Sequence, residues 1–203
     1  YAYAIDNAGN RSNVSDTKTI VLDTLAPVIK TNPVASPTNQ NVILNYTVID
    51  SNSVIISGDS SPYTADGVYN ITLIGIDAAG NTSIASVSFT IDKTPPNVPV
   101  IIIEKELVNN TTISKITGTA EAGCTVLLNV INPLNGTYQF PIITANNTGV
   151  WEYNNIWLGQ GDGAYRFYAY AIDDAGNRSN SSDTKTIVLD TLAPNAPVIT
   201  IER

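Results

Sequence analysis

The sequence contains no histidine, a single cysteine and few basic residues. Without histidine, neither a Ser-His-Asp triad nor a Cys-His pair can form, so these catalytic arrangements are excluded. Cys124 has no second cysteine for a disulfide, and its surroundings, AGCTVLL, predict a small buried residue on a strand. There is no apolar run of about 18 residues, which argues against a membrane-spanning helix. A glycine-rich phosphate loop is also missing. We therefore expect a protein that is not an enzyme.

The charge balance is acidic, with 10 Lys plus Arg against 18 Asp plus Glu and a formal net charge of −8. Nucleic-acid binding needs clustered Lys and Arg, so the composition argues against a nucleic-acid partner. Cations are the natural ligands of such a surface.

One phrase occurs twice almost unchanged. Residues 1–27 read YAYAIDNAGNRSNVSDTKTIVLDTLAP, and residues 168–194 differ only by Asp174 for Asn7 and Ser181 for Val14. A looser copy, LIGIDAAGNTSIASVSFTIDKTPP, ends at Pro96. The copies end 69 and 98 residues apart, which are the sizes of small β-domains. We predict four parts: the C-terminal hairpin of an incomplete domain (1–27), a short domain (28–96), a longer domain (97–194) and the first strand of a further domain (195–203).

The patterns within these parts predict an all-β fold. In residues 86–92, SVSFTID, apolar and polar residues alternate with the period of two that is typical of a half-buried strand. Residues 165–171 place Tyr165, Phe167, Ala169 and Ala171 on one face. The DxAGN sequences predict hairpin turns, because Asp caps nearby amides and Gly accepts a positive φ. Many short strands separated by such turns favour antiparallel sandwiches.

Several segments together carry a family resemblance. ITGTAEAGCTVLLNV, TGVWEY, GDGAYRFYAYAIDDAGNRS and IVLDTLAP resemble the bacterial Ig-like domains of large secreted or cell-surface adhesins, over essentially all of 97–194. Residues 28–96 resemble a shorter Ig-like relative. The resemblance implies tandem Ig-like antiparallel β-sandwich domains at an extracellular or cell-surface location. It also implies that Trp151 is buried, and we expect Trp157 to be partly buried.

In an Ig-like sandwich, the end of the last strand lies near the top of the following domain. This arrangement predicts that the Asp before each linker Pro meets the Asp of the next DxAGN turn. The resemblance to adhesin arrays implies, in addition, that Ca²⁺ stiffens the chain at these positions. Oxygen ligands of this kind suit Ca²⁺. The expected metal ligands are Asp23, Asp50 and Asp77 at one junction and Asp92, Glu121 and Asp173 at the next, with Asn81, Asn177 and Asp174 as supplementary ligands.

An alternative explanation of these aspartates needs no metal. Asp before Ala-Gly-Asn can simply cap its own turn, and Asp before Thr-x-x-Pro can bond linker amides. The sequence leaves both explanations open.

The leading functional hypothesis is a non-catalytic stalk segment of an extracellular repeat adhesin, stiffened by Ca²⁺ at interdomain junctions. Its partners would be neighbouring Ig-like domains of the same chain, with cell-surface glycans bound through other domains. One alternative is a carbohydrate-binding accessory module of an extracellular enzyme, in which Tyr168 and Tyr170 stack on sugars. Another is a subunit of an extracellular filament or surface layer, formed by pairing of strand edges.

Overall fold

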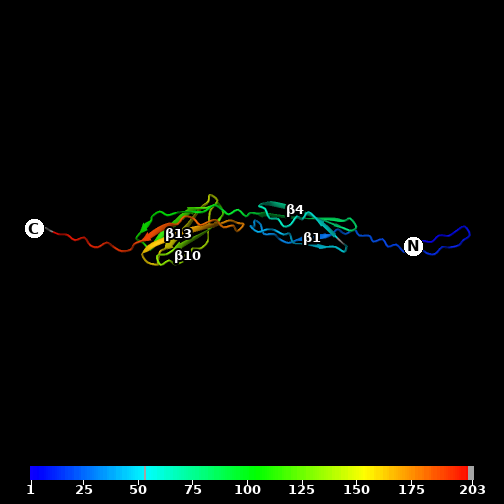
Figure 1. Cartoon of the computed structure of the whole chain (residues 1–203), viewed down its shortest axis with the longest axis horizontal. Coiled ribbons are helices and arrows are strands. Elements are labelled where there is room, and N and C mark those ends of the chain that lie inside the picture. Colours follow the sequence, from blue (N-terminus) through cyan, green and yellow to red (C-terminus); the bar gives the residue numbers. More distant parts are fainter. Residues whose placement is uncertain (53, 201–203) are drawn as a thin grey trace. The chain divides into compact units, whose positions relative to one another are not determined.

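Every helix or strand assigned in residues 1–52 and 54–200, which the computed structural model describes, is a β-strand (Figure 1). The prediction of an all-β fold is confirmed. No helix in this described part is long and apolar enough to cross a membrane. Strands β1–β5 pair among themselves, as do β6–β14.

By their internal contacts, the residues form two compact units. The N-terminal unit comprises Tyr1–Val34, Ile43–Ser61 and Asn70–Ser88, and the C-terminal unit comprises Ala35–Val42, Pro62–Tyr69 and the chain from Phe89 onward. The predicted domain boundaries at 27/28, 96/97 and 194/195 are not tested by this division and stay predictions. Residues 195–200 carry no strand, and the rest of the predicted segment 195–203 lies outside the described residues.

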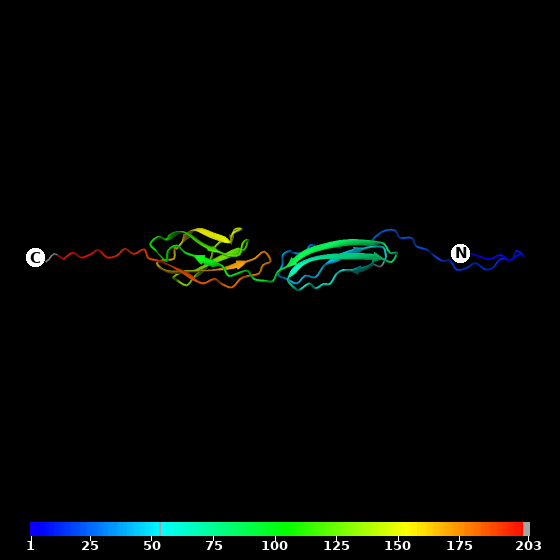
Figure 2. The same ribbon diagram turned by 90° about the horizontal axis from the view of Figure 1, so that it is seen from above.

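The first group of strands forms two small sheets. Strands β1 (Val28–Thr31) and β2 (Tyr46–Ile49) are antiparallel, while β3 (Val54–Ser57), β4 (Gly67–Asp77) and β5 (Thr82–Ile91) form a second sheet in that order. The long strands β4 and β5 run side by side in Figure 2.

Burial alternates along β5 as the period of two predicts. Val87, Phe89 and Ile91 are buried, with 9%, 2% and 1% of their surfaces exposed. Phe89 packs in the C-terminal unit against two tyrosines, with its ring centroid 5.4 Å from that of Tyr63 and 5.1 Å from that of Tyr69. Alternate apolar residues therefore supply the core, because successive side chains of a strand point to opposite faces.

The second group of strands forms a sandwich of two sheets within the C-terminal unit. One sheet has the order β12–β8–β6, and the other has the order β10–β9–β13–β14–β7, with β11 also paired to β9. Their bounds are β6 (Val100–Ile102), β7 (Leu107–Val108), β8 (Thr112–Thr119), β9 (Thr125–Ile131), β10 (Thr137–Gln139), β11 (Ile143–Thr144), β12 (Val150–Trp157), β13 (Gly163–Ile172) and β14 (Lys185–Leu189).

One ladder of this sandwich is parallel. Strand β6 pairs antiparallel with β8 in one sheet, and the chain then crosses so that β7 pairs parallel with β14 in the other. The prediction of an antiparallel sandwich therefore holds for the other ladders but not for this two-residue edge. The cause is that the chain passes from one sheet to the other between β6 and β7, so β7 enters the second sheet in the same direction as β14.

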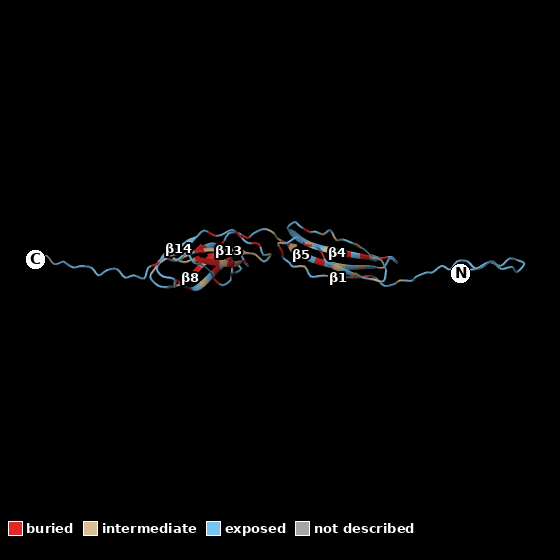
Figure 3. Cartoon of the chain, turned by 60° about the horizontal axis from the view of Figure 1, so that its bottom comes forward, coloured by how far each residue is buried: buried red, intermediate tan, exposed pale blue. Residues whose placement is uncertain are grey.

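The core lies between the two sheets and is continuous. Figure 3 shows buried residues, coloured red, on β13 and β14. Tyr165, Phe167, Ala169 and Ala171 are all buried, as their spacing predicts. Trp151 is buried at 1% exposure, as the family resemblance implied. It lies opposite Gly118, where an added Cβ would come within 2.3 Å of the indole ring, so only glycine fits at that position.

Trp157 differs from the expectation of partial burial, because 67% of its surface is exposed. The alternation of β12 explains the difference. Ile156 is buried at 1% and occupies the core-facing position, so its neighbour points outward. Cys124 is buried at 3%, as predicted, but it directly precedes β9 and does not lie on a strand.

Candidate metal centre

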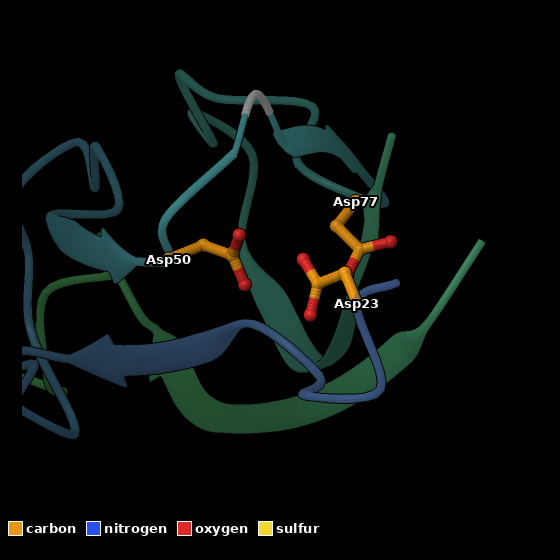
Figure 4. A group of neighbouring side chains, drawn as sticks. All are labelled: Asp23, Asp50 and Asp77. Carbon is orange, nitrogen blue, oxygen red and sulfur yellow. The ribbon is translucent and has the colours of Figure 1, made fainter. Parts of the chain in front are cut away.

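Three carboxylates from separate segments come together in the N-terminal unit. One oxygen from each of Asp23, Asp50 and Asp77 lies within 4.8 Å of the others. Asp23 precedes the linker to β1, Asp50 directly follows β2, and Asp77 is the last residue of β4. Figure 4 shows the three side chains gathered at one end of these strands. The structure thus brings together the three residues that the sequence assigned to the first junction.

Asp77 is held by the turn that follows it. Its Oδ1 accepts hydrogen bonds from the backbone amides of Ala79 at 2.9 Å and Asn81 at 2.8 Å, and its Oδ2 accepts one from Asn81 Nδ2 at 2.8 Å. Gly80 has a φ of 93°, which a residue with a Cβ rarely adopts. The hydrogen bond from the Asn81 side chain is the main cause that lowers the pKa of the Asp77 carboxyl, so this group stays ionised.

Asp23 and Asp50 also accept hydrogen bonds from backbone amides two residues later. Leu25 N donates to Asp23 Oδ1 at 3.0 Å, and Asn52 N donates to Asp50 Oδ1 at 2.7 Å. These bonds are the ones that the turn-capping alternative predicts. Asx turns of this kind use only part of the acceptor capacity of a carboxylate, which has about four lone-pair sites. Capping and metal binding are therefore compatible in this arrangement.

Asn52 and Asn81 join the three segments. Asn52 Nδ2 donates a short hydrogen bond to Asp23 Oδ2, and Asn81 Nδ2 donates to the Asp23 carbonyl oxygen at 3.2 Å. Asn81 is predicted to be a supplementary ligand, whereas its amide nitrogen donates to the Asp23 carbonyl oxygen and to Asp77 Oδ2. Asn52 was missed, although its position two residues after Asp50 is itself a signal of an Asx turn.

The second predicted set is arranged differently. In the described part of the chain, Asp92, Glu121 and Asp173 do not form a second group of three carboxylates as close as the first. Asn177 joins two of these residues: its Nδ2 donates to the Asp92 carbonyl oxygen at 2.8 Å and to Asp173 Oδ2 at 2.9 Å. Asp92 Oδ1 accepts from Thr94 N at 3.0 Å, again as an Asx turn.

The charge around this second turn is nevertheless strongly negative. Burial raises the pKa of the Cys124 thiol, and the negative charges of Glu121, Asp173 and Asp174 raise it further. The three carboxylates are therefore near enough to Cys124 to act on its thiol, and Glu121 and Asp174 are exposed. In the same turn as Asp173 and Asp174, the Ala175 carbonyl oxygen accepts a hydrogen bond from Asn39 N at 3.2 Å.

Two further aspartates hold the linkers and were missed as linker contacts. Asp66 accepts from Lys93 N at 3.0 Å and from the Thr94 hydroxyl at 3.1 Å. Asp162 accepts from the amide and hydroxyl of Thr191 at 3.0 and 2.9 Å. The sequence signal is the Asp-Gly that precedes the penultimate strand of both domains. The linkers after Asp92 and Asp190 are therefore each fixed by a second aspartate.

The first group fits the requirements of Ca²⁺. Oxygens bound at 2.3–2.6 Å on opposite sides of one ion lie roughly 5 Å apart, and a span of 4.8 Å is compatible with this geometry. Asp77 is only 5% exposed and is ionised, so a neighbouring carboxylate repels it unless a cation lies between them. Carboxylates and backbone carbonyls are the ligand types that hard cations select.

The proposed sugar platform of Tyr168 and Tyr170 is partly covered. The guanidinium carbon of Arg178 lies 3.6 Å from the centroid of the Tyr170 ring, and the two tyrosine rings meet edge to face at 5.9 Å. The N-terminal copy has the same cation–π pair, with Arg11 3.4 Å from the Tyr3 centroid. These contacts indicate a packed outer strand face and remove the Tyr170 face from sugar stacking.

No protein-family model matches this sequence, and no curated protein matches it. Three solved structures that do match are similar as follows. The fibronectin(III)-like modules of Clostridium thermocellum CbhA are 18% identical, with 84% of this chain and 100% of that chain covered and a TM-score of 0.47. A tetra-tandem repeat in the extending region of a large adhesion protein is 19% identical, with 93% and 55% covered and a TM-score of 0.45. A 1.5-MDa bacterial ice-binding adhesin is 18% identical, with 92% and 71% covered and a TM-score of 0.38.

Proposed function

We propose that this chain is a non-catalytic stalk segment of an extracellular tandem-repeat adhesin, stiffened where its β-domains join by Ca²⁺ bound to Asp23, Asp50 and Asp77. The observation that carries the proposal is the convergence of these carboxylates within 4.8 Å from a linker, a strand end and a hairpin turn. A cation at this point ties the end of the repeated phrase to the turn of the following repeat. Bending at the linker then requires breaking metal–oxygen bonds.

The repeats support a mechanical role over a catalytic one. Each repeated phrase supplies the same Asp-capped hairpin turn and the same Asp before the linker proline, and a catalytic site is not normally duplicated in this way. The linkers are also fixed by side chains, through Asp66 and Asp162, independently of any ion. Linkers fixed to a domain in this way are what a rigid spacer needs.

The affinity of such sites fits the outside of a cell. Extracellular modules bind Ca²⁺ with a Kd of roughly 10⁻⁴–10⁻³ M. At ten times Kd, one ion stabilises the state that binds it by about 1.4 kcal/mol. In a domain of this size, that free energy corresponds to a rise in Tm of roughly 6–11 °C.

Asp50→Asn tests the first site with little disturbance. Asp50 accepts a hydrogen bond from Asn52 N, and an Asn oxygen can accept the same bond while removing the charge. Asp16→Asn, at an exposed aspartate outside the group, is the charge-matched control. We expect 5 mM Ca²⁺ to raise the Tm of the wild type and of Asp16→Asn, and to leave Asp50→Asn nearly unchanged. Equal Tm values with Ca²⁺ and with chelator in the wild type would refute the metal proposal.

We extend the proposal to a second ion held by Asp92, Glu121 and Asp173, with Asp174 and Asn177 nearby. Its support is the hydrogen bond from Asn177 Nδ2 to the Asp92 carbonyl oxygen, together with the negative charges of Glu121, Asp173 and Asp174 that act on Cys124. Titration calorimetry with CaCl₂ separates the two sites, since two bound ions are expected for the wild type and one for Asp173→Asn. A stoichiometry of one bound ion in both proteins would mean that only the first site binds Ca²⁺ and that the second site is wrong.

A further inference from the structure

A pocket opens in the large sandwich, and none of the predicted metal ligands lines it. It has a volume of about 510 Å³ and lies between β10, β12 and the loop that follows β12. Strands β10 and β12 are edge strands of different sheets, so the pocket occupies the open side of the sandwich. Its volume falls within the range of small-molecule binding sites, which is roughly 300–1,000 Å³.

Aromatic rings form two sides of this pocket. Tyr138 and Trp157 are 61% and 67% exposed, which is unusual for side chains of this size. Behind them, the Phe140 ring centroid lies 5.5 Å from Tyr138 and 5.0 Å from Tyr153. Phe140 is 8% exposed, so it forms part of the base. The exposed Tyr138 ring thus rests on a packed aromatic layer.

The position of Trp157 is fixed by the loop beside it. An added Cβ on Gly159 would lie 1.8 Å from the nearest atom of the Trp157 ring, so the indole lies directly against the glycine backbone. The loop in turn closes on Tyr165, whose hydroxyl accepts a hydrogen bond from Gln160 N at 2.9 Å and lies 2.9 Å from the carbonyl oxygens of Leu158 and Gly161. The exposed indole is therefore held in place before any ligand arrives.

The polar groups of the pocket are uncharged. Asn132, Asn155 and Gln160 line it, and none of the fourteen lining residues is Asp, Glu, Lys or Arg. Asn155 has a φ of 57°, which is uncommon for a residue other than glycine and costly within a strand. Strained backbone of this kind often lies at binding sites. A neutral ligand is favoured, because nothing in the lining compensates a charge.

We propose that this pocket binds a neutral oligosaccharide. The C–H face of a sugar ring is apolar and packs on exposed aromatic rings such as Trp157 and Tyr138. Sugar hydroxyls both donate and accept hydrogen bonds, and an amide side chain offers a donor and an acceptor together. The site is distinct from Tyr168 and Tyr170, and it does not depend on the stalk proposal or on Ca²⁺.

Nuclear magnetic resonance on the full ¹⁵N-labelled chain provides a direct test. The chain has two tryptophans, so the indole N–H signals of exposed Trp157 and buried Trp151 serve as reporter and internal control. The probes are neutral tetrasaccharides of glucose, xylose, galactose and N-acetylglucosamine. We expect at least one probe to shift the Trp157 signal saturably while Trp151 stays unchanged.

Variants then assign the binding to this pocket. Trp157→Ala removes the exposed side chain and with it the reporter, so binding by this variant is followed through backbone amide signals and should be at least tenfold weaker. Asn155→Gly removes the amide but keeps the positive φ, and should weaken binding severalfold. Tyr168→Ala is the matched control on the rival surface and should bind as the wild type does. The proposal is wrong if no probe binds saturably at 20 mM, if Tyr168→Ala loses binding while Trp157→Ala keeps it, or if anionic tetragalacturonate binds as tightly as the neutral probes.

Discussion

Residues 1–27 and 168–194 carry nearly the same sequence in two different surroundings. In the second copy, Ile187 and Leu189 are buried at 2% and 1%, whereas the equivalent Ile20 and Leu22 are 92% and 86% exposed. Residues 185–189 form strand β14, but residues 18–22 form no strand. The same five residues, KTIVL, are therefore a core strand in one place and an exposed segment in the other.

The hairpin turn, in contrast, is the same in both copies. Ser12 N donates to the Ala4 carbonyl at 2.9 Å, as Ser179 N does to the Ala171 carbonyl. The side chain of Asn10 donates to Asp6 Oδ2 at 2.9 Å, as that of Asn177 does to Asp173 Oδ2. All these partners lie within the phrase, so each copy encodes its own turn.

The location of the partners explains the difference between turn and strand. Strand β14 pairs with residues 163–167, which lie outside the repeated phrase. It also pairs with β7, which lies much earlier in the chain. Its burial also depends on the opposite sheet. The comparison teaches that this phrase specifies its turn locally, while its last strand is specified by the rest of the domain.

The largest expected difference between the copies concerns the buried leucine. Leu189→Ala creates a cavity in the core and should cost about 2–5 kcal/mol of unfolding free energy. Leu22→Ala changes an exposed side chain and should stay within about 0.5 kcal/mol. Scanning calorimetry of the full chain measures both. For a domain of about 100 residues, we expect Leu189→Ala to lower the Tm of the corresponding transition by more than about 8 °C. Similar shifts for the two variants would show that residues 1–27 are buried in solution.

The same contrast between local and long-range contacts determines which features could be predicted from the sequence alone. Alternation identified the buried faces of β5 and β13, because burial there follows directly from the period of two. The convergence of Asp23, Asp50 and Asp77 was predictable once an Ig-like arrangement was assumed, since both strand ends and turns were visible in the repeats. Whether they bind a metal remains a prediction.

Other features depended on contacts between distant segments and could not be predicted in this way. The hydrogen bonds that Thr94 donates to Asp66 and that Thr191 donates to Asp162 span 28 and 29 residues. An aspartate or a threonine at such a position does not by itself reveal its partner. The exposure of Trp157 depended on the register of β12, which a single tryptophan does not reveal. Asn155 with its positive φ carried no sequence signal, because Asn is common throughout the chain.

A smaller difference is expected at the asparagine of the turn. Asn177 is 8% exposed and donates to both Asp173 and the Asp92 carbonyl, so Asn177→Ala leaves partly buried acceptors without this donor. The expected cost is about 1–3 kcal/mol. Asn10 is exposed and its side chain donates to Asp6, so Asn10→Ala should change the unfolding free energy by less than about 0.5 kcal/mol. Urea unfolding followed by circular dichroism compares the two. A cost at Asn177 no larger than that at Asn10 would mean that the tie to Asp92 adds nothing to stability.

The smallest expected effect is a shift in pKa without a change in overall stability. The hydrogen bond from the Asn10 side chain is the largest cause that lowers the pKa of the exposed Asp6 carboxyl, just as Asn81 lowers that of Asp77. A lowered pKa means that the ionised form favours the turn. The turn should therefore be fully favoured above the ordinary pKa of Asp and lose this contribution as the pH falls through the lowered value. Carboxyl chemical shifts measured against pH should show Asp6 titrating below an ordinary Asp, and Asn10→Ala should move its pKa upward. An unchanged pKa in that variant would mean that the turn of residues 6–10 is not formed in solution, and the two copies of the phrase would then differ even in their turns.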